Sequence, residues 1–275
     1  MTVLSQFLSA LQLQSNIVLI SVHAVRGSVP REVGAWMAVC QDHTTGTIGG
    51  GRLEWDATAY AKELLAQEPV PLPHLQPQRR LYRLGPSLGQ CCGGEVELQF
   101  ERVSSADADV LRERLQPAYP TVALFGGGHV GHAIVQVLGT LDWPIVWIDS
   151  RDEVFPEDMP DSVQCEHSEP VYAAVPTLPS GSMVLIMSFS HAEDLDIVAA
   201  CLARQRDRGD LPFIGLIGSK TKWASFRSRL VARGFSESEL AKVTSPIGIA
   251  GIGSKRPEAI AIGVAAQLLL LQSQT

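Results

Sequence analysis

Short apolar runs alternate with amphipathic stretches along the second half of the chain. Residues 182–187 and 212–217 are mostly apolar and have the length of buried strands. Each run is followed by a segment with helical periodicity, over residues 192–203 and 221–233, and a last helix is predicted over residues 258–271. Strands that alternate with helices predict a parallel sheet with right-handed crossovers and helices on both faces.

A glycine-rich turn stands at the start of this second half. Gly126, Gly128 and Gly131 follow the apolar run 122–125 with the spacing G-x-G-x-x-G, and a segment with helical periodicity comes next. A second apolar run ends at Asp149. A strand, a glycine turn, a helix and an acidic residue about 20 positions further on are the order of a Rossmann βαβ unit. In such a unit the helix N-terminus meets a phosphate and the acidic residue meets a ribose.

The first half of the chain has a less regular pattern. Residues 2–14 and 52–65 have the apolar spacing of amphipathic helices. Residues 42–46 are predicted to form a turn, and the proline-rich residues 68–78 a surface connection. Strands are predicted from apolar or alternating runs, over residues 16–25, 36–40, 47–48, 79–84 and 95–101. This mixture predicts a smaller α+β domain.

Polar residues and prolines separate the two halves. Residues 102–109 are largely polar and charged, a short helix is predicted over residues 110–115, and two prolines lie within residues 117–120. We therefore predict an α/β protein, with an N-terminal α+β domain over residues 1–116 and a C-terminal Rossmann-like domain over residues 117–275.

Composition and charge narrow the classes of function. The chain has 275 residues, of which 45% are hydrophobic, and this is ordinary for a soluble globular protein. The net charge of −7 argues against a general surface for nucleic acid or anionic membranes. The N-terminal segment lacks the basic region and cleavage site of a signal peptide. Five cysteines, two of them adjacent, do not suit a disulfide framework, so we expect a reducing cytoplasm.

Two glycine-rich loops of the first domain carry candidate binding chemistry. Gly49, Gly50 and Gly51 precede a predicted helix, so they form either a second phosphate cradle or a tight strand-to-helix turn. Cys91 and Cys92 lie among glycines in a loop. A partly exposed thiolate there could attack a substrate or bind a metal, and tight packing is the alternative.

The carboxyl ends of the predicted parallel strands collect further polar residues. Ligands of open α/β sheets bind at this edge. Lys220 follows a strand and opens a helix, so it is placed to meet a phosphate, whereas Ser219 could serve only as the N-cap of that helix. The sequence shows no Ser-His-Asp arrangement, zinc signature or acid–base pair. The polar residues at this edge are His129, Asp149, Ser188, His191, Ser219 and Lys220, with Ser254, Lys255 and Arg256 before the last helix.

Several blocks of the sequence together resemble one protein family. They include a Cys-Cys-Gly-Gly motif and a Ser-Lys-Arg-Pro motif, and they occur over residues 27–31, 34–37, 46–51 with Glu54, 88–94, 125–131, 214–220, 246–248 and 254–257. In this order they resemble the XdhC/CoxI family, accessory proteins that mature xanthine dehydrogenase and related molybdenum hydroxylases. The two named motifs are more similar to the xanthine dehydrogenase branch than to the CO dehydrogenase branch.

The resemblance implies a chaperone for the molybdenum cofactor rather than a catalyst. Such a protein binds molybdopterin, supports its sulfuration with sulfur from a cysteine desulfurase, and inserts it into apo-xanthine dehydrogenase. It is expected to be a cytoplasmic homodimer. Thiolates are soft ligands, so Cys91 or Cys92 is expected to contact molybdenum. The expected cofactor-binding residues are Arg31, Gly49, Gly50, Gly51, Cys91, Cys92, Gly126, Gly128, His129, Gly131, Asp149, Ser219, Lys220 and Lys255.

Two other functions fit parts of the sequence. An NAD(P)-dependent oxidoreductase would use Asp149 to hold a ribose hydroxyl. Against it, the chain shows no catalytic pair, and its most distinctive motifs lie outside the Rossmann half. A pure docking protein with a vestigial nucleotide fold would need neither the glycine turn nor a ligand.

Overall fold

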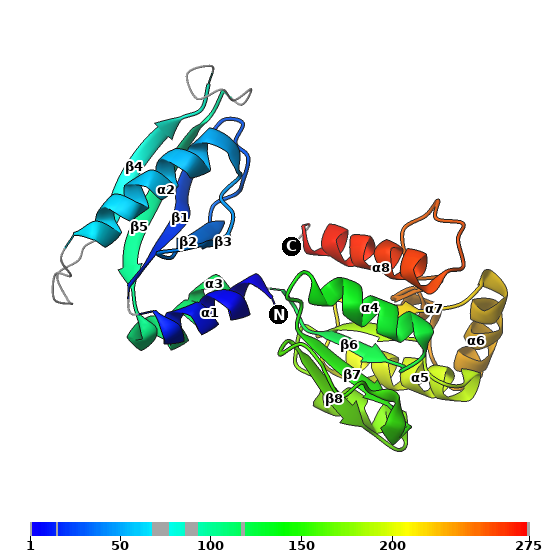
Figure 1. Ribbon diagram of the computed structural model, residues 1–275. Helices are drawn as coiled ribbons and strands as arrows, with labels where there is room; N and C mark the ends of the chain where they lie inside the picture. Colours follow the sequence, from blue (N-terminus) through cyan, green and yellow to red (C-terminus); the bar gives the residue numbers. More distant parts are fainter. Residues whose placement is uncertain (1, 15, 68–76, 86–92, 117–118, 274–275) are drawn as a thin grey trace. The chain divides into compact units, whose positions relative to one another are not determined.

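The computed structural model describes residues 2–14, 16–67, 77–85, 93–116 and 119–273. The chain divides into two compact units, Met1–Gln116 and Pro117–Thr275 (Figure 1). Among the helices in the described part of the chain, none combines the length and the apolar character that crossing a membrane requires.

The first unit is built on an antiparallel sheet. Its strands are β1 (Ile17–Arg26), β2 (Trp36–Val39), β3 (Thr44–Gly46), β4 (Gln78–Arg83) and β5 (Glu95–Val103), in the spatial order β3-β2-β1-β5-β4. Its helices are α1 (Val3–Leu13), α2 (Gly51–Ala66) and α3 (Ala108–Leu115), with the short 3₁₀ helix η2 (Ser105–Asp107) before α3.

Both faces of this sheet are covered. Successive side chains of a strand point to opposite faces, so Val18 and Ile20 of β1 pack with α2, while Ile17 and Leu19 pack with α1 and α3. Burial on both faces explains why the sequence of β1 is a continuous apolar run rather than an alternating one.

One element of this unit differs from the sequence prediction. The predicted turn over residues 42–46 and strand over residues 47–48 are wrong, because β3 spans Thr44–Gly46 and pairs with β2. The Ile48 N–H donates to the carboxylate of Glu54 at 2.9 Å instead of to a neighbouring strand. Because the Glu54 carboxylate takes the N–H of Ile48, residues 47–48 do not form the strand that the sequence predicts.

The second unit contains a parallel sheet. Its strands are β6 (Val122–Phe125), β7 (Ile145–Asp149), β8 (Val163–His167), β9 (Met183–Ile186), β10 (Phe213–Leu216) and β11 (Val243–Thr244). Their spatial order is β11-β10-β9-β6-β7-β8, and every pair is parallel. The chain starts in the middle at β6 and builds outward in both directions. This is the Rossmann order, with its topological switch point between β6 and β9.

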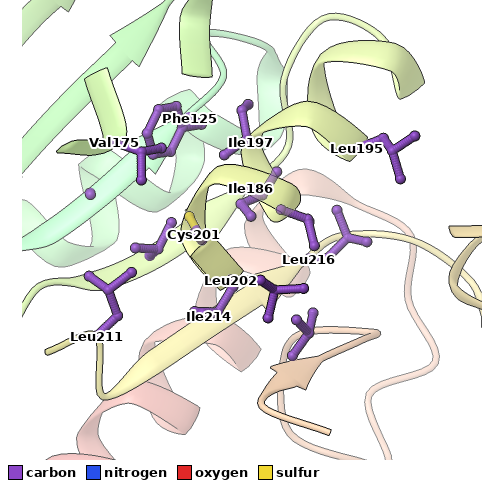
Figure 2. Close-up of a cluster of buried hydrophobic side chains, with 14 of the residues drawn as sticks. Phe125, Val175, Ile186, Leu195, Ile197, Cys201, Leu202, Leu211, Ile214 and Leu216 are labelled. Carbon is purple, nitrogen blue, oxygen red and sulfur yellow. The ribbon is translucent and has the colours of Figure 1, made fainter. Parts of the chain in front are cut away.

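Helices cover both faces of the parallel sheet, which confirms the predicted fold class. The α-helices are α4 (His129–Gly139), α5 (His191–Asp207), α6 (Lys220–Ala232), α7 (Glu237–Leu240) and α8 (Pro257–Gln272), and the 3₁₀ helices are η3 (Asp152–Val154) and η4 (Val171–Thr177). Val122 and Leu124 of β6 face α4 and α8, whereas Ala123 and Phe125 face the other side. Figure 2 shows the hydrophobic core on the face of Ala123 and Phe125, where Phe125, Ile186 and Ile214 of the sheet lie around Cys201 of α5.

Two strands of this sheet have no clear sequence signal. β8 lies at one edge of the sheet, and its five residues are exposed or half-buried, so they form no apolar run. β11 lies at the other edge and has only two residues. Hydrophobic periodicity detects strands through their buried faces, so edge strands of this kind escape it.

Candidate functional site

Two glycines of the turn after β6 are fixed by close packing. A Cβ on Gly126 would lie 2.1 Å from the carbonyl oxygen of Met187, at the end of β9. A Cβ on Gly131 would lie 2.1 Å from the carbonyl oxygen of Gly126. The φ angle of Gly126 is +127°, a conformation that favours glycine. These two glycines bring α4 and the loop after β9 close to β6 at the switch point.

The remaining glycine of the motif, Gly128, faces open space. A Cβ on Gly128 would have no described atom within 4 Å. Gly128 is the N-cap of α4, and in the described part of the chain no side chain caps this helix. The first N–H groups of a helix have no acceptor within the helix, and they carry its positive dipole end. The turn therefore leaves open space at the N-terminus of α4 beside Gly128 and the exposed His129, the kind of helix end at which anions can bind.

The buried carboxylate of Asp149 is hydrogen-bonded to the backbone of this turn. Its side chain is 2% exposed, and its Oδ2 accepts the Gly127 N–H at 2.6 Å. The Arg151 guanidinium donates to both carboxylate oxygens, at 2.9 and 3.0 Å. Burial alone would raise the pKa of Asp149, but the hydrogen bonds from Arg151 and Gly127 lower it below its ordinary value. The Arg151 backbone N–H donates to Oδ1 as well, so the carboxylate predicted to meet a ribose already accepts four hydrogen bonds from the chain itself.

A second buried carboxylate joins the loops after β9 and β10. Asp194 accepts the N–H and the hydroxyl of Ser188, both at 2.8 Å, and the ammonium of Lys222 at 2.6 Å. Lys222 also donates to the carbonyl of Ile217 at 2.9 Å. This network was not identified from the sequence. One feature of the sequence could have indicated it. Lys222 lies in the first turn of α6, where the helix dipole disfavours a positive charge unless a carboxylate lies nearby.

Other residues expected at this edge lie at the starts of α5 and α6 and in the loop before α8. Ser219 is the N-cap of α6 and accepts the Lys222 N–H at 3.2 Å. Lys220 is exposed at the first position of α6, and His191 is exposed at the first position of α5. Lys255 is exposed in the loop that precedes α8.

In the first unit, three glycine-containing stretches that are distant in sequence come together. A Cβ on Gly49 would lie 2.5 Å from Pro30, so the turn before α2 packs on the loop that contains Arg31. A Cβ on Gly94 would lie 2.4 Å from the carbonyl oxygen of Ser28 in the same loop. Arg31 itself pairs with Glu32 at 3.2 Å. Cys91 and Cys92 precede Gly94 and lie outside the described residues.

The triple-glycine turn already holds an anion. The N–H groups of Gly49 and Gly50 donate to the Glu54 carboxylate at 3.2 and 2.8 Å, and the Thr47 hydroxyl donates to the same oxygen. Burial would raise the pKa of Glu54, but these hydrogen bonds lower it below its ordinary value. A phosphate could use these two N–H groups only by displacing Glu54. The turn before α2 therefore fits a phosphate less well than the turn before α4.

The described cysteines and acidic residues do not form a metal site. In the part of the chain that the structure describes, no group of three or more His, Cys, Asp or Glu residues could hold a metal ion. Cys40 and Cys201 are buried, and burial raises the pKa of Cys201 to about 12. A thiol with so high a pKa is a poor nucleophile and a poor ligand at neutral pH.

Replacing Glu54 with alanine should destabilise the first unit, because the N–H groups of Gly49 and Gly50 lose their acceptor. The expected loss is about 1–3 kcal/mol of unfolding free energy, measured by urea denaturation of the full chain. Glu63→Ala is the matched control, since Glu63 lies exposed on the same helix. Equal stability of the two variants would contradict the bracing role of Glu54.

Asp149→Asn should lower stability most strongly at neutral pH. The lowered pKa of Asp149 means that its ionised form stabilises the folded state above the unfolded pKa of about 3.9. This stabilisation disappears as the pH falls through the folded pKa, so the difference between wild type and variant should shrink below about pH 4. Thermal unfolding from pH 7 to pH 3 measures it, with the exposed Asp158→Asn as control. A difference that does not change with pH would argue against this assignment.

Comparisons with known proteins match both units of the chain. Residues 122–268 match the XdhC Rossmann domain, and residues 10–74 match the XdhC and CoxI family. The uncharacterized protein YqeB of Escherichia coli K12 is 26% identical over 250 residues, which are 90% of this chain and 42% of YqeB. This chain therefore spans less than half the length of that relative.

One of the solved structures compared shares the fold of the whole chain. A xanthine dehydrogenase (BH1974) from Bacillus halodurans aligns with a TM-score of 0.77 and 20% identity, over 100% of this chain and 96% of that one. A Rossmann-fold NAD(P)-binding family protein from Shigella flexneri reaches a TM-score of only 0.39 with 16% identity, over 56% of this chain and 87% of that one. The XdhC Rossmann domain match by itself covers more than half of the chain, and it confirms the resemblance found in the sequence. The chain belongs to the XdhC and CoxI family.

Proposed function

We propose that this protein is an accessory protein of xanthine dehydrogenase that binds the molybdenum cofactor as molybdopterin. It supports sulfuration of the cofactor and its insertion into the apo-hydroxylase. The observation that carries the proposal is the open helix end at Gly128, which suits the terminal phosphate of molybdopterin. Membership of the XdhC and CoxI family supports it further.

The residues at the switch point fit such a ligand in distinct ways. Gly126 and Gly131 allow α4 to approach the sheet, and Gly128 leaves room for a phosphate at the helix N-terminus. His129 stands at the first helical position, where a neutral imidazole can donate one hydrogen bond to a phosphate oxygen. Lys220 and Lys255 are exposed cations that would attract the anion.

The proposed metal ligands are two cysteines of the first unit. Cys91 or Cys92 would contact molybdenum through a soft thiolate or take part in sulfur exchange. Gly94, two residues after Cys92 in the sequence, is packed on the loop that leads to Arg31. Since Glu54 binds the N–H groups of Gly49 and Gly50, the triple-glycine turn would shape this region rather than hold the phosphate. When bound, the cofactor supplies the molybdenum at which sulfur is introduced.

The proposed partners follow from this role. A cysteine desulfurase would supply the sulfur, and apo-xanthine dehydrogenase would receive the cofactor. Both the thiols and the exchange chemistry require a reducing compartment, so we place the protein in the cytoplasm. We propose a homodimer that acts as a maturation chaperone rather than as a catalyst.

The Rossmann strand order favours an NAD(P)-dependent oxidoreductase as the second candidate. Two observations weigh against it. The Asp149 carboxylate is engaged by Gly127 and Arg151, so a ribose hydroxyl would have to compete with charged and buried donors. The carboxyl edge also carries buried ion pairs rather than an exposed acid–base pair. Titration with NAD and NADP separates the two functions, because only the second candidate requires tight dinucleotide binding.

Protein purified from a cofactor-producing cell should carry molybdenum and pterin in equal amounts. Gly128→Val should lower both at least tenfold, because its side chain would fill the space in front of α4. The control is Gly139→Ala, at the other end of the same helix. Metal analysis and the fluorescence of the acid-released pterin measure the two contents. Wild-type protein without pterin, or a Gly128→Val variant with a full complement, would contradict the proposal.

The double variant Cys91→Ala/Cys92→Ala tests the metal end separately. It should lose molybdenum relative to pterin and fail to activate apo-xanthine dehydrogenase. The molybdenum-to-pterin ratio and the recovered hydroxylase activity are the readouts. A double variant that binds the complete cofactor and activates the hydroxylase normally would exclude a role for these cysteines.

A further inference from the structure

Phe189 is a large aromatic side chain exposed beside the switch point. It lies in the loop between β9 and α5, and 68% of it is exposed. Both of its neighbours are held in place. Ser188 donates to Asp194 through its N–H and its hydroxyl, and the Ser190 hydroxyl accepts the Glu193 N–H as the N-cap of α5. The ring is thus presented from a fixed backbone, and its exposure needs an explanation.

Arg151 contacts this ring from the other side of β6. Its Cζ lies 4.6 Å from the centroid of the Phe189 ring. Arg151 follows β7 and Phe189 follows β9, and these two strands are the neighbours of β6 in the sheet. The guanidinium is fixed by two hydrogen bonds to the buried Asp149, so it cannot swing freely into solvent. The pair therefore spans the carboxyl end of the strand that leads into the glycine turn.

One oxygen connects the pair to the turn. Oδ2 of Asp149 accepts both the Gly127 N–H at 2.6 Å and the Arg151 Nη2 at 3.0 Å. A ligand with its phosphate at the N-terminus of α4 would lie at the same edge of the sheet as Arg151 and Phe189. Because Asp149 neutralises Arg151, the pair offers flat surfaces rather than an uncompensated charge.

We propose that Arg151 and Phe189 form a stacking platform for a flat nitrogen heterocycle that is attached to the bound phosphate. The proposal rests on the proposed function for the position of that phosphate. Aromatic rings and guanidinium groups both stack on the π-faces of heterocycles. Two heterocycles have this chemistry: the pterin itself, and a nucleobase appended to it through a second phosphate.

Titration calorimetry of the full chain tests the platform with defined probes. Ribose 5-phosphate supplies a phosphate without a heterocycle, AMP and CMP add a nucleobase, and 6-hydroxymethylpterin phosphate adds a pterin. Wild-type protein should bind at least one heterocyclic probe about tenfold more tightly than ribose 5-phosphate. Phe189→Ala should abolish that ratio and Phe189→Trp should retain it. The probe that shows the preference identifies the heterocycle.

Tyr172→Ala is the matched control, since Tyr172 is an exposed aromatic residue in η4 of the same unit. It should leave the ratio unchanged. A wild-type protein without the preference, or a Phe189→Ala variant that keeps it, overturns the platform. Gly128→Val distinguishes the platform from the phosphate site. If that variant binds all probes as wild type does while Phe189→Ala abolishes the ratio, the platform stands and the proposed phosphate position is wrong.

Discussion

The hydrogen bond between Gly127 and Asp149 organises the carboxyl edge of the parallel sheet. A carboxylate that is 2% exposed would carry a large desolvation cost if it were unpaired. Here it is satisfied by a backbone N–H of the turn and by the fork of Arg151. The bond therefore couples three features. It joins the glycine turn to Asp149, Asp149 in turn binds the guanidinium of Arg151, and that guanidinium lies over the ring of Phe189.

The two glycine turns of the protein use an acidic residue in opposite ways. In the turn before α2, Glu54 binds the N–H groups of Gly49 and Gly50 from the first turn of the helix itself. It occupies the position that an external anion would take. In the turn before α4, the N–H that Asp149 accepts is that of Gly127, and Asp149 lies at the end of β7. The space beside Gly128 stays open, so similar glycine-rich sequences give a turn filled by a carboxylate in one unit and a turn with an open helix end in the other.

Sequence patterns identified the elements that have a local signature, such as an apolar run or a fixed glycine spacing. The buried strands β6, β7, β9 and β10 are apolar runs, and the glycine spacing at residues 126–131 directly reflects the close packing of α4 on the sheet. The contacts that distinguish the two turns were not identifiable in this way. Glu54 and Asp149 differ in which N–H groups they reach, and that depends on the path of the backbone rather than on residue type. The pairing of Lys222 with Asp194 joins residues on two helices, and no periodicity encodes it.

The charges at the carboxyl edge determine what kind of recognition it can provide. Arg151 is neutralised by Asp149, and Lys222 is neutralised by Asp194. Both acids are buried, so these cations are committed to the fold and cannot follow a ligand. An anion that binds there would meet the backbone N–H groups of α4 and exposed cations such as Lys220 rather than Arg151 or Lys222, in a chain whose net charge is −7. This favours a ligand that gains the rest of its affinity from a flat ring lying on Phe189.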